Sequence, residues 1–282
     1  MGQGQSQHTE RFSGRVQAYQ TYRPRFPREI VSFVRQHGAL PDAVVADVGA
    51  GTGMLAEIFL EAGHRVIAVE PNGEMLEACR ELAVQEPALE VVEGSAESTT
   101  LPDASVDLIA VGRAMHWFDW PRAHREFQRI LRPDGWVLLA SNGHSDSGGP
   151  IPNRLSQILR KWRTDSAEAD TTHGFEERLQ GFLDASTWHR TTLQHSMTVD
   201  FPTLLGYAES LSAIPRPGER GYDEMVAELR AVFEEYQRDG MLQTPLTCNL
   251  HLGHLRAEFT GPGLKPTTDG IGIREDSTSS QL

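Results

Sequence analysis

Short apolar runs alternate with helical periodicity through the middle of the chain. Five runs of the buried-strand type lie at residues 43–48, 65–69, 89–92, 106–111 and 136–140. Amphipathic helical patterns separate most of them, at 54–62, 73–84 and 121–131. Strands that alternate with helices imply βαβ crossovers and a mostly parallel sheet, and nearly continuous apolar strands fit a sheet that is covered on both faces. The pattern therefore predicts an α/β fold.

The rhythm changes after the fifth run. A loop rich in Gly, Ser and Pro covers 142–152, and two further strands are predicted at 190–201 and 244–252. Helical patterns surround them, at 154–163, 175–183, 202–212 and 222–239. We expect the late strands to add an antiparallel edge, which gives a Rossmann-like sheet of seven strands with a reversed last strand and helical insertions after strand 5.

The chain outside this core is simpler. Residues 1–9 are polar and predicted to be disordered, and so is the polar tail from 256 to 282. An amphipathic segment at 10–20 is interrupted by the prolines of 22–27, and a helix is predicted at 28–37. We expect one domain over 10–255, with its core at 43–141 and substrate-side insertions at about 142–189 and 202–240.

The composition of the chain limits the kinds of partner that we expect. The 282-residue chain has a formal net charge of −13, which disfavours nucleic acid. Five arginines between Arg11 and Arg28 are interleaved with prolines and aromatics, which indicates a local pocket or packing feature. The two cysteines, Cys79 and Cys248, have no metal-type spacing, and we expect no metal. No apolar stretch is long enough to span a membrane and no signal peptide is evident, so we expect a cytoplasmic protein.

The strongest chemical signal lies between the first strand and the first helix, where the sequence reads Asp47-Val48-Gly49-Ala50-Gly51-Thr52-Gly53. Glycines there permit positive φ angles and close approach of a ligand to the backbone. A dinucleotide site would use Gly-x-Gly-x-x-Gly, but its third glycine position is occupied by Met54. Asp47 also adds negative charge where a pyrophosphate prefers positive surroundings. A ligand with a cationic centre suits this loop better.

Glu70 ends the second strand. A carboxylate there can accept hydrogen bonds from both hydroxyls of a ribose, each worth about 1.5–3 kcal/mol. This position alone does not separate nucleoside cofactors, because dinucleotide enzymes use the same contact. Coming one βαβ unit after a glycine loop, Glu70 favours a nucleoside ligand over a solvated strand-end glutamate.

These motifs together resemble those of the class I S-adenosylmethionine-dependent methyltransferases. The resemblance covers roughly residues 43–141 and looks closest to the small-molecule branch, which includes ubiquinone/menaquinone and trans-aconitate methyltransferases. It is carried by Asp47 to Gly53, Glu70-Pro71-Asn72, Gly94-Ser95-Ala96-Glu97, Asp107 to Phe118, and Leu131-Arg132-Pro133-Asp134-Gly135.

The resemblance implies S-adenosylmethionine as cofactor and assigns roles to residues. Asp47 would lie near the cofactor's amino group, the glycine loop near its methionine and ribose, and Glu70 on the ribose hydroxyls. Residues expected along the remaining cofactor surface are Ala50, Pro71, Asn72, Met75, Ser95, Ala96, Glu97, Gly112 and Arg113. Glu97 as a solvated loop acid is the alternative interpretation.

The segment from Gly112 to Phe118 would face the transferable methyl group. A small residue at Gly112 would leave room for the sulfonium, and Trp117 or Phe118 could stabilise it by a cation–π contact of about 0.5–2 kcal/mol. His116 could remove a proton from an acceptor. The alternatives are core packing of both aromatics and no catalytic role for His116. Apolar candidates for the acceptor pocket are Trp162, Phe175, Phe182, Trp188 and Tyr207.

The N-terminal segment supplies two more candidates. Tyr19 could cover the methionine end of the cofactor, and Arg23 could bind its carboxylate through a bidentate pair. A surface arginine packed on aromatics is the alternative.

The sequence thus predicts direct in-line transfer of a methyl group to a small-molecule acceptor. Three other classes stay open: a non-catalytic S-adenosylmethionine-binding regulator, a protein methyltransferase, and an NAD-dependent oxidoreductase, which the glycine spacing disfavours. The acceptor atom is left undetermined among oxygen, nitrogen and carbon.

Overall fold

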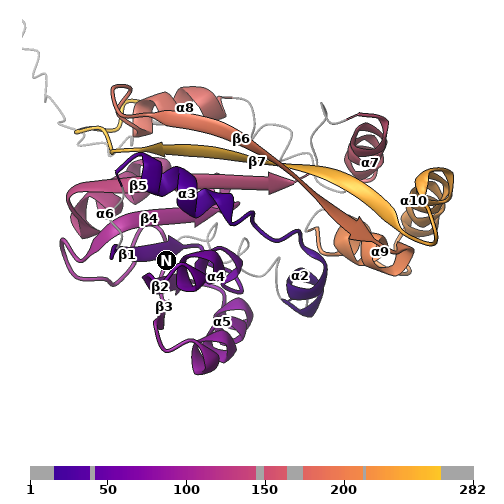
Figure 1. Cartoon of the computed structure of the whole chain (residues 1–282), viewed down its shortest axis with the longest axis horizontal. Helices are drawn as coiled ribbons and strands as arrows, with labels where there is room; N and C mark the ends of the chain where they lie inside the picture. The colour runs from indigo at the N-terminus through magenta and orange to yellow at the C-terminus, as the bar shows by residue number, and fades with distance from the viewer. Residues whose placement is uncertain (1–15, 39–41, 144–148, 164–173, 212–213, 262–282) are drawn as a thin grey trace, which may run out of the picture.

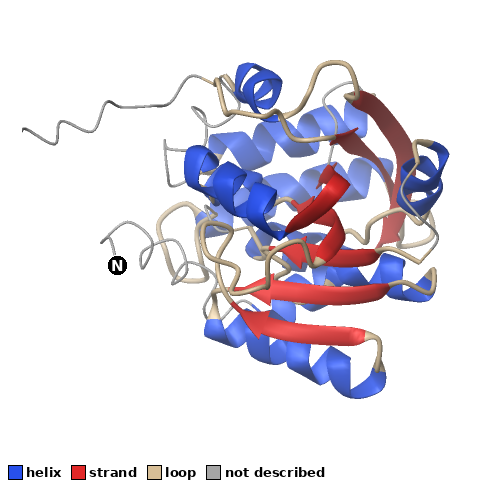
Figure 2. Cartoon of the chain, turned by 90° about the vertical axis from the view of Figure 1, so that its left-hand side faces the viewer, coloured by secondary structure: helices blue, strands red, loops and turns tan. Residues whose placement is uncertain are grey.

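The computed structural model describes residues 16–38, 42–143, 149–163, 174–211 and 214–261. Within these residues, seven strands form one sheet in the order β3-β2-β1-β4-β5-β7-β6 (Figures 1 and 2). The strands are β1 (Val44–Val48), β2 (Arg65–Glu70), β3 (Leu89–Glu93), β4 (Val106–Gly112), β5 (Leu131–Gly143), β6 (His189–Val199) and β7 (Leu242–Gly253).

The first five strands are parallel, whereas β7 runs antiparallel to both β5 and β6. This confirms the predicted seven-stranded sheet with a reversed last strand. Strand order reverses between β1 and β4, so the chain leaves these two neighbouring strands in opposite directions across the sheet. Such a switch point opens a crevice at the carboxyl ends of the strands, which is where open α/β sheets bind ligands.

Helices cover both faces of the sheet (Figure 2). On one face, alternate strand residues pack against α3 (Glu29–Gln36), α4 (Met54–Glu61) and α5 (Gly73–Gln85). On the other face, they pack against α6 (Trp120–Ile130) and α8 (Phe175–Phe182). Because strand side chains alternate between faces, each parallel strand contributes apolar residues to both cores.

A third apolar cluster lies beyond the central sheet. It joins the far ends of β6 and β7 to α7 (Pro150–Lys161), α9 (Phe201–Glu209) and α10 (Tyr222–Tyr236). Figure 1 shows these helices grouped around the long β6–β7 pair, away from β1, β2 and β3. The N-terminal helix α2 (Val16–Tyr22) packs against α9, so the start of the chain contacts this late region.

Asp107 ties three strands together. Its Oδ2 accepts hydrogen bonds from the Val44 backbone N at 2.8 Å and from Arg132 Nη1 at 2.7 Å. The predicted turn after Leu131 is a bulge inside β5, where pairing with β4 jumps from Val106–Leu131 to Leu108–Trp136. Asp134 lies in this bulge with a φ of +61°, which explains why turn residues occur within a strand.

The ends of the chain differ from the prediction in one respect. We predicted a disordered tail from Arg256, but the backbone N of Arg256 donates to Phe182 O at 3.0 Å and that of Thr260 donates to Gly181 O at 3.2 Å. A Cβ on Gly181 would lie 2.3 Å from the Gly261 N, so α8 leaves room there for this segment. Residues 1–15 and 262–282 lie outside the described residues. Within the described part, no helix combines the length and apolar character needed to cross a membrane.

Candidate active site

The glycine loop after β1 is fastened to β2. The backbone N–H groups of Gly49 and Ala50 both donate to Val69 O, at 2.9 and 3.2 Å. Gly49, Gly51 and Gly53 have φ angles of +72°, +59° and +88°. All three lie in the left-handed region, which costs other residues roughly 1–2 kcal/mol. The sequence motif therefore encodes a backbone shape that only glycine adopts without strain.

Two of these glycines also permit close packing. A Cβ on Gly49 would lie 2.6 Å from Ala114 Cβ, and one on Gly53 would lie 2.8 Å from Leu82 Cδ2. Gly51 is different, because its nearest neighbour would be a ring atom of Tyr19 at 4.0 Å. The middle of the loop thus faces the N-terminal helix α2 across a gap of ordinary van der Waals size.

Asp47 is fully buried beneath this loop. Its Oδ2 accepts the backbone N–H of Ala56 at 3.0 Å, while Oδ1 is buried without a hydrogen-bond partner among the described residues. Burial, reinforced by the nearby carboxylate of Glu70, raises the pKa of Asp47 to about 7. A buried carboxylate oxygen with no donor is costly, which is what a site for a cationic group would show.

Glu70 links the two sides of the crevice. Its Oε2 accepts the Gly51 N–H at 2.8 Å and its Oε1 accepts the Asn72 N–H at 2.9 Å. Burial raises the pKa of Glu70, although both backbone hydrogen bonds oppose that shift. Asn72 Oδ1 caps α5 by accepting the Met75 N–H at 3.0 Å, so these two predicted contact residues shape the helix start. Pro71, which lies between Glu70 and Asn72, is exposed.

The loop after β3 folds back on itself. Ser95 and Ser98 exchange two backbone hydrogen bonds of 3.1 Å each, and Ala96 is buried between them. Glu97 Oε1 accepts the backbone N–H of Asp119 at 2.8 Å. Glu97 is half-buried and ties this loop to the start of α6.

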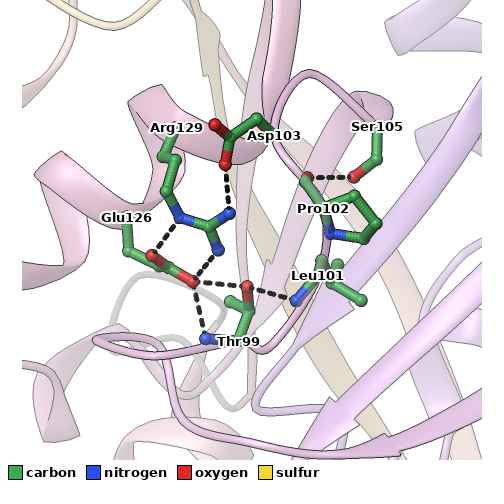
Figure 3. Close-up of polar contacts among 7 residues, drawn as sticks. All are labelled: Thr99, Leu101, Pro102, Asp103, Ser105, Glu126 and Arg129. Atoms are coloured by element: carbon green, nitrogen blue, oxygen red, sulfur yellow. Dashed lines mark hydrogen bonds and ion pairs between the residues drawn. The ribbon is translucent and has the colours of Figure 1, made fainter.

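A charged network holds the far end of the same loop (Figure 3). Glu126 Oε1 accepts from the backbone N and the hydroxyl of Thr99, at 2.7 and 2.6 Å, and both Glu126 oxygens pair with Arg129. Arg129 also binds Asp103 at 2.6 Å. These hydrogen bonds, chiefly those from Arg129, lower the pKa of Glu126 to about 2. Sequence reasoning missed this network, because nothing in the motif pattern links α6 to residues 99–103.

The N-terminal segment brings two arginines together on one ring. The guanidinium carbons of Arg23 and Arg113 lie 5.0 and 5.6 Å from the Tyr19 ring centroid. Arg23 donates to Ser210 O at 3.2 Å, and burial lowers its pKa. Within the part of the chain that the structure describes, the Nε atoms of both arginines are buried without a hydrogen-bond partner. The predicted Tyr19–Arg23 cap over the glycine loop is thus joined by Arg113 from the end of β4.

The segment after β4 differs from the prediction in detail. Gly112 makes room for core side chains, since a Cβ there would lie 3.0 Å from Phe26 and 3.2 Å from Leu55. Phe118 packs edge-on against Phe127 and close to Gly49, which is the core-packing alternative. The 3-10 turn η1 (Met115–Trp117) produces this arrangement, because it directs successive side chains to different sides.

A cavity of about 860 Å³ lies beside this turn. Its floor consists of residues from β4, β5, β7 and β6, and its rim includes His116 and the start of α8. The lining residues are Val111, Arg113, Met115, His116, Leu139, Ala140, Ser141, Arg163, Phe175, Glu176, Arg190, Thr191, Thr192, Asn249, Leu250 and His251. The cavity therefore adjoins the crevice of Asp47 and Glu70 at the end of β4.

Few predicted pocket residues line this cavity. His116 does, and its ring stacks on Trp117 with centroids 4.7 Å apart, but Trp117 and Phe118 are not lining residues. Of the five apolar candidates, Phe175 alone is a lining residue. Phe182 is buried in the core against Phe127. Aromatic spacing by itself did not distinguish pocket from core.

The polar lining residues of the late strands were missed. Arg190 and Thr192 alternate along β6, as do Asn249 and His251 along β7. This period of two was visible in the sequence and placed each pair on one strand face. The sequence did not reveal the pairing register that brings the two strands together.

Among the residues that the structure describes, no group of three or more His, Cys, Asp or Glu side chains could hold a metal ion. Cys79 and Cys248 are both buried. Burial raises the pKa of each thiol to about 12, which makes both poor nucleophiles.

Comparison with known proteins agrees with this geometry. Residues 46–139 match the model of a family described as a methyltransferase domain. An uncharacterized methyltransferase of Mycobacterium tuberculosis is 40% identical over 150 residues, which cover 52% of this chain and 58% of the relative. A malonyl-[acyl-carrier protein] O-methyltransferase of Pectobacterium atrosepticum is 30% identical over 173 residues, covering 60% of this chain and 63% of the relative.

The fold has a counterpart among solved structures. A structure from Anaeromyxobacter dehalogenans superimposes with a TM-score of 0.61 at 23% identity and covers 83% of this chain and 98% of that one. Residues 46–139 are thus similar to a methyltransferase domain, and the sheet has the same fold as that solved structure. S-adenosylmethionine is the cofactor that the matched methyltransferase domain implies. The chain spans little more than half the length of its mycobacterial relative.

Proposed function

We propose that this protein transfers a methyl group from S-adenosylmethionine to a small-molecule acceptor bound in the 860 Å³ cavity. The observation that carries the proposal is the pair of buried acids at the switch point. Asp47 keeps one oxygen without a donor, and Glu70 sits across a left-handed glycine turn from it. Two buried acids repel an anionic ligand and favour one with positive charge and hydroxyl groups.

The residues present fit such a cofactor. Asp47 Oδ1 is a ready acceptor for an ammonium group, and Glu70 for ribose hydroxyls. Arg23 offers a buried, unpartnered Nε and packs on Tyr19, which suits it to bind a carboxylate. When bound, S-adenosylmethionine would supply an electrophilic methyl group on a positively charged sulfur. The protein's part is to hold acceptor and cofactor in line and to exclude water, which supplies up to about 7–11 kcal/mol.

The cavity supports a small acceptor rather than a macromolecule. It is lined by residues of four strands, of η1 and of α8, so it is a partly open hollow rather than a flat surface. Volumes of roughly 300–1,000 Å³ are typical of small-molecule sites. His116 lines the cavity and could accept a proton from a hydroxyl or amine acceptor, whereas a carboxylate acceptor would need no base.

The test has two stages. Calorimetry of the full chain with S-adenosylmethionine and with S-adenosylhomocysteine is expected to show binding, and NADH is expected to show none. Formation of S-adenosylhomocysteine is then measured over a panel of small acids, alcohols, phenols and amines. Binding of NADH in place of the nucleoside would overturn the proposal, and cofactor binding without turnover on any acceptor would favour a non-catalytic regulator.

A further inference from the structure

The cavity reverses the charge balance of the chain. The protein has 39 acidic and 26 basic residues, yet among the residues that the structure describes the cavity is lined by Arg113, Arg163 and Arg190 and by one acid, Glu176. Such a local reversal in an acidic protein attracts anions into one place. The charge alone does not locate an anion site. The pairing of β6 with β7 shows which polar side chains of the cavity lie together.

Arg190 and His251 stand side by side on the floor. They are directly paired across β6 and β7, and Thr192 is paired with Asn249 one step further along. Directly opposed residues in antiparallel strands project from the same face with Cβ atoms about 4.5–5.5 Å apart. The four side chains therefore form one patch at the cavity floor.

The hydrogen bonds inside this patch use acceptor atoms of His251 and Asn249 and leave the N–H groups of both side chains for a ligand. Trp188 Nε1, which can only donate, donates to His251 Nδ1 at 3.2 Å. A neutral His251 consequently carries its hydrogen on Nε2. Burial lowers the pKa of His251, with Glu176 opposing and Arg190 reinforcing the shift, which favours that neutral form.

A hydrogen bond also orients the side-chain amide of Asn249. The hydroxyl of Thr192 donates to Asn249 Oδ1 at 2.8 Å, so the amide NH₂ is the group left for a ligand. Arg190 adds a guanidinium that has only donors. Three neighbouring side chains thus present N–H groups, which is the arrangement that binds a carboxylate.

The patch lies at the far end of the cavity from the cofactor crevice. β4, whose end carries Arg113 and His116, is separated from β6 by β5 and β7. Three strand spacings correspond to roughly 14 Å. An acceptor anchored on β6 and β7 would therefore reach towards His116 with its other end.

We propose that the acceptor is a small organic acid whose carboxylate binds Arg190, His251 and Asn249 while the atom to be methylated lies near His116. This inference rests on the proposed function and adds the substrate class to it. It assigns recognition to residues that contact no part of the crevice formed by Asp47 and Glu70.

The test uses the full chain saturated with S-adenosylhomocysteine. Hexanoate, benzoate, cinnamate and adipate are titrated by calorimetry at up to roughly millimolar concentration, each beside its primary amide, which has similar shape without the charge. We expect at least one acid to bind about tenfold or more tightly than its amide. Arg190→Gln should remove about tenfold of the acid's affinity and leave the amide's unchanged.

Arg238→Gln is the matched control, because Arg238 is exposed outside the cavity and its substitution changes the net charge equally. Equal binding of acids and amides, equal effects of Arg190→Gln and Arg238→Gln, or no binding of any acid would overturn the inference. Failure of S-adenosylhomocysteine itself to bind would instead overturn the proposed function. His251→Leu, with an unchanged melting temperature, should reproduce part of the Arg190→Gln loss.

Discussion

The crevice at β1 and β2 and the cavity over β5, β7 and β6 are built in opposite ways. In the crevice, Asp47 and Glu70 lie at the carboxyl ends of their strands, next to the glycine turn, and local backbone shape places them. In the cavity, side chains from strands far apart in the chain meet through antiparallel pairing. The shape of the crevice is therefore set by local sequence, which suits a cofactor that does not vary. In the cavity, a single substitution on one strand would change which polar groups face the ligand.

The largest expected effect falls on the crevice. Asp47→Asn keeps an acceptor for the Ala56 N–H but removes the charge, and it should weaken S-adenosylmethionine binding about 10- to 100-fold, since a charged hydrogen bond contributes roughly 1.5–3 kcal/mol. Calorimetry measures this directly. Glu77→Gln on the exposed face of α5 is the control and should bind normally. Equal affinities in both variants would remove Asp47 from the site.

The second-largest expected effect is that of pH on cofactor binding in the crevice. The pKa of Asp47 is raised to about 7, so below that pH the unbound protein holds a proton that a cationic ligand must displace. Cofactor affinity should fall roughly tenfold per unit as the pH drops below 7. The raised pKa of Asp47 also affects folding without ligand. The free energy of unfolding should decrease as pH rises from 3.8 to about 7, because the folded protein holds the proton longer than the unfolded chain.

Asp47→Asn provides the comparison for this pH dependence. Binding to that variant, measured from pH 5.5 to 8.5, should be nearly flat. If the unsubstituted protein were equally flat, its Asp47 would already be ionised and the raised pKa would be wrong.

The backbone shape of the glycine loop gives the third prediction. In Gly49→Ala, the alanine would keep a φ of +72° and its Cβ would lie 2.6 Å from Ala114 Cβ. The free energy of unfolding should therefore fall by about 2–4 kcal/mol. Gly63→Ala has a φ of +87° with nothing within 4 Å and should cost about 1–2 kcal/mol. Urea unfolding of both variants separates packing from backbone strain. Similar losses in the two would mean that Ala114 moves away freely.

The smallest effect concerns the network of Figure 3. Glu126→Gln weakens the anchor of Thr99 and Arg129 and should lower cofactor affinity only a few-fold, because it acts through the loop after β3. The pKa of Glu126 is depressed to about 2, so its stabilisation is present above pH 4.5 and is lost as pH falls towards 2.

Melting temperatures between pH 5 and 2 test this point. The Gln variant should show a shallower acid slope than the unsubstituted protein, while Glu234→Gln on α10, which is exposed, should keep the full slope. An unchanged slope in Glu126→Gln would mean that the network does not stabilise the fold.

The sequence predicted much of the fold, because period and turn chemistry are local. The five early strands and the three helices between them follow from apolar runs and glycine punctuation. Asp47 and Glu70 were found by their position at the carboxyl ends of strands. The packing of Gly112 and Phe118 against Phe26 and Phe127 could not be predicted, because these neighbours come from other elements.

What the sequence determined by itself was the order of the elements and the shape of the loop from Asp47 to Gly53, since both depend on the preferences of neighbouring residues along the chain. The tertiary structure decided which polar side chains of β6 and β7 meet, and that Arg113 joins Arg23 on Tyr19. Strand register and helix docking depend on packing across the whole molecule, and a shift of one residue would turn Arg190 and His251 to the opposite face.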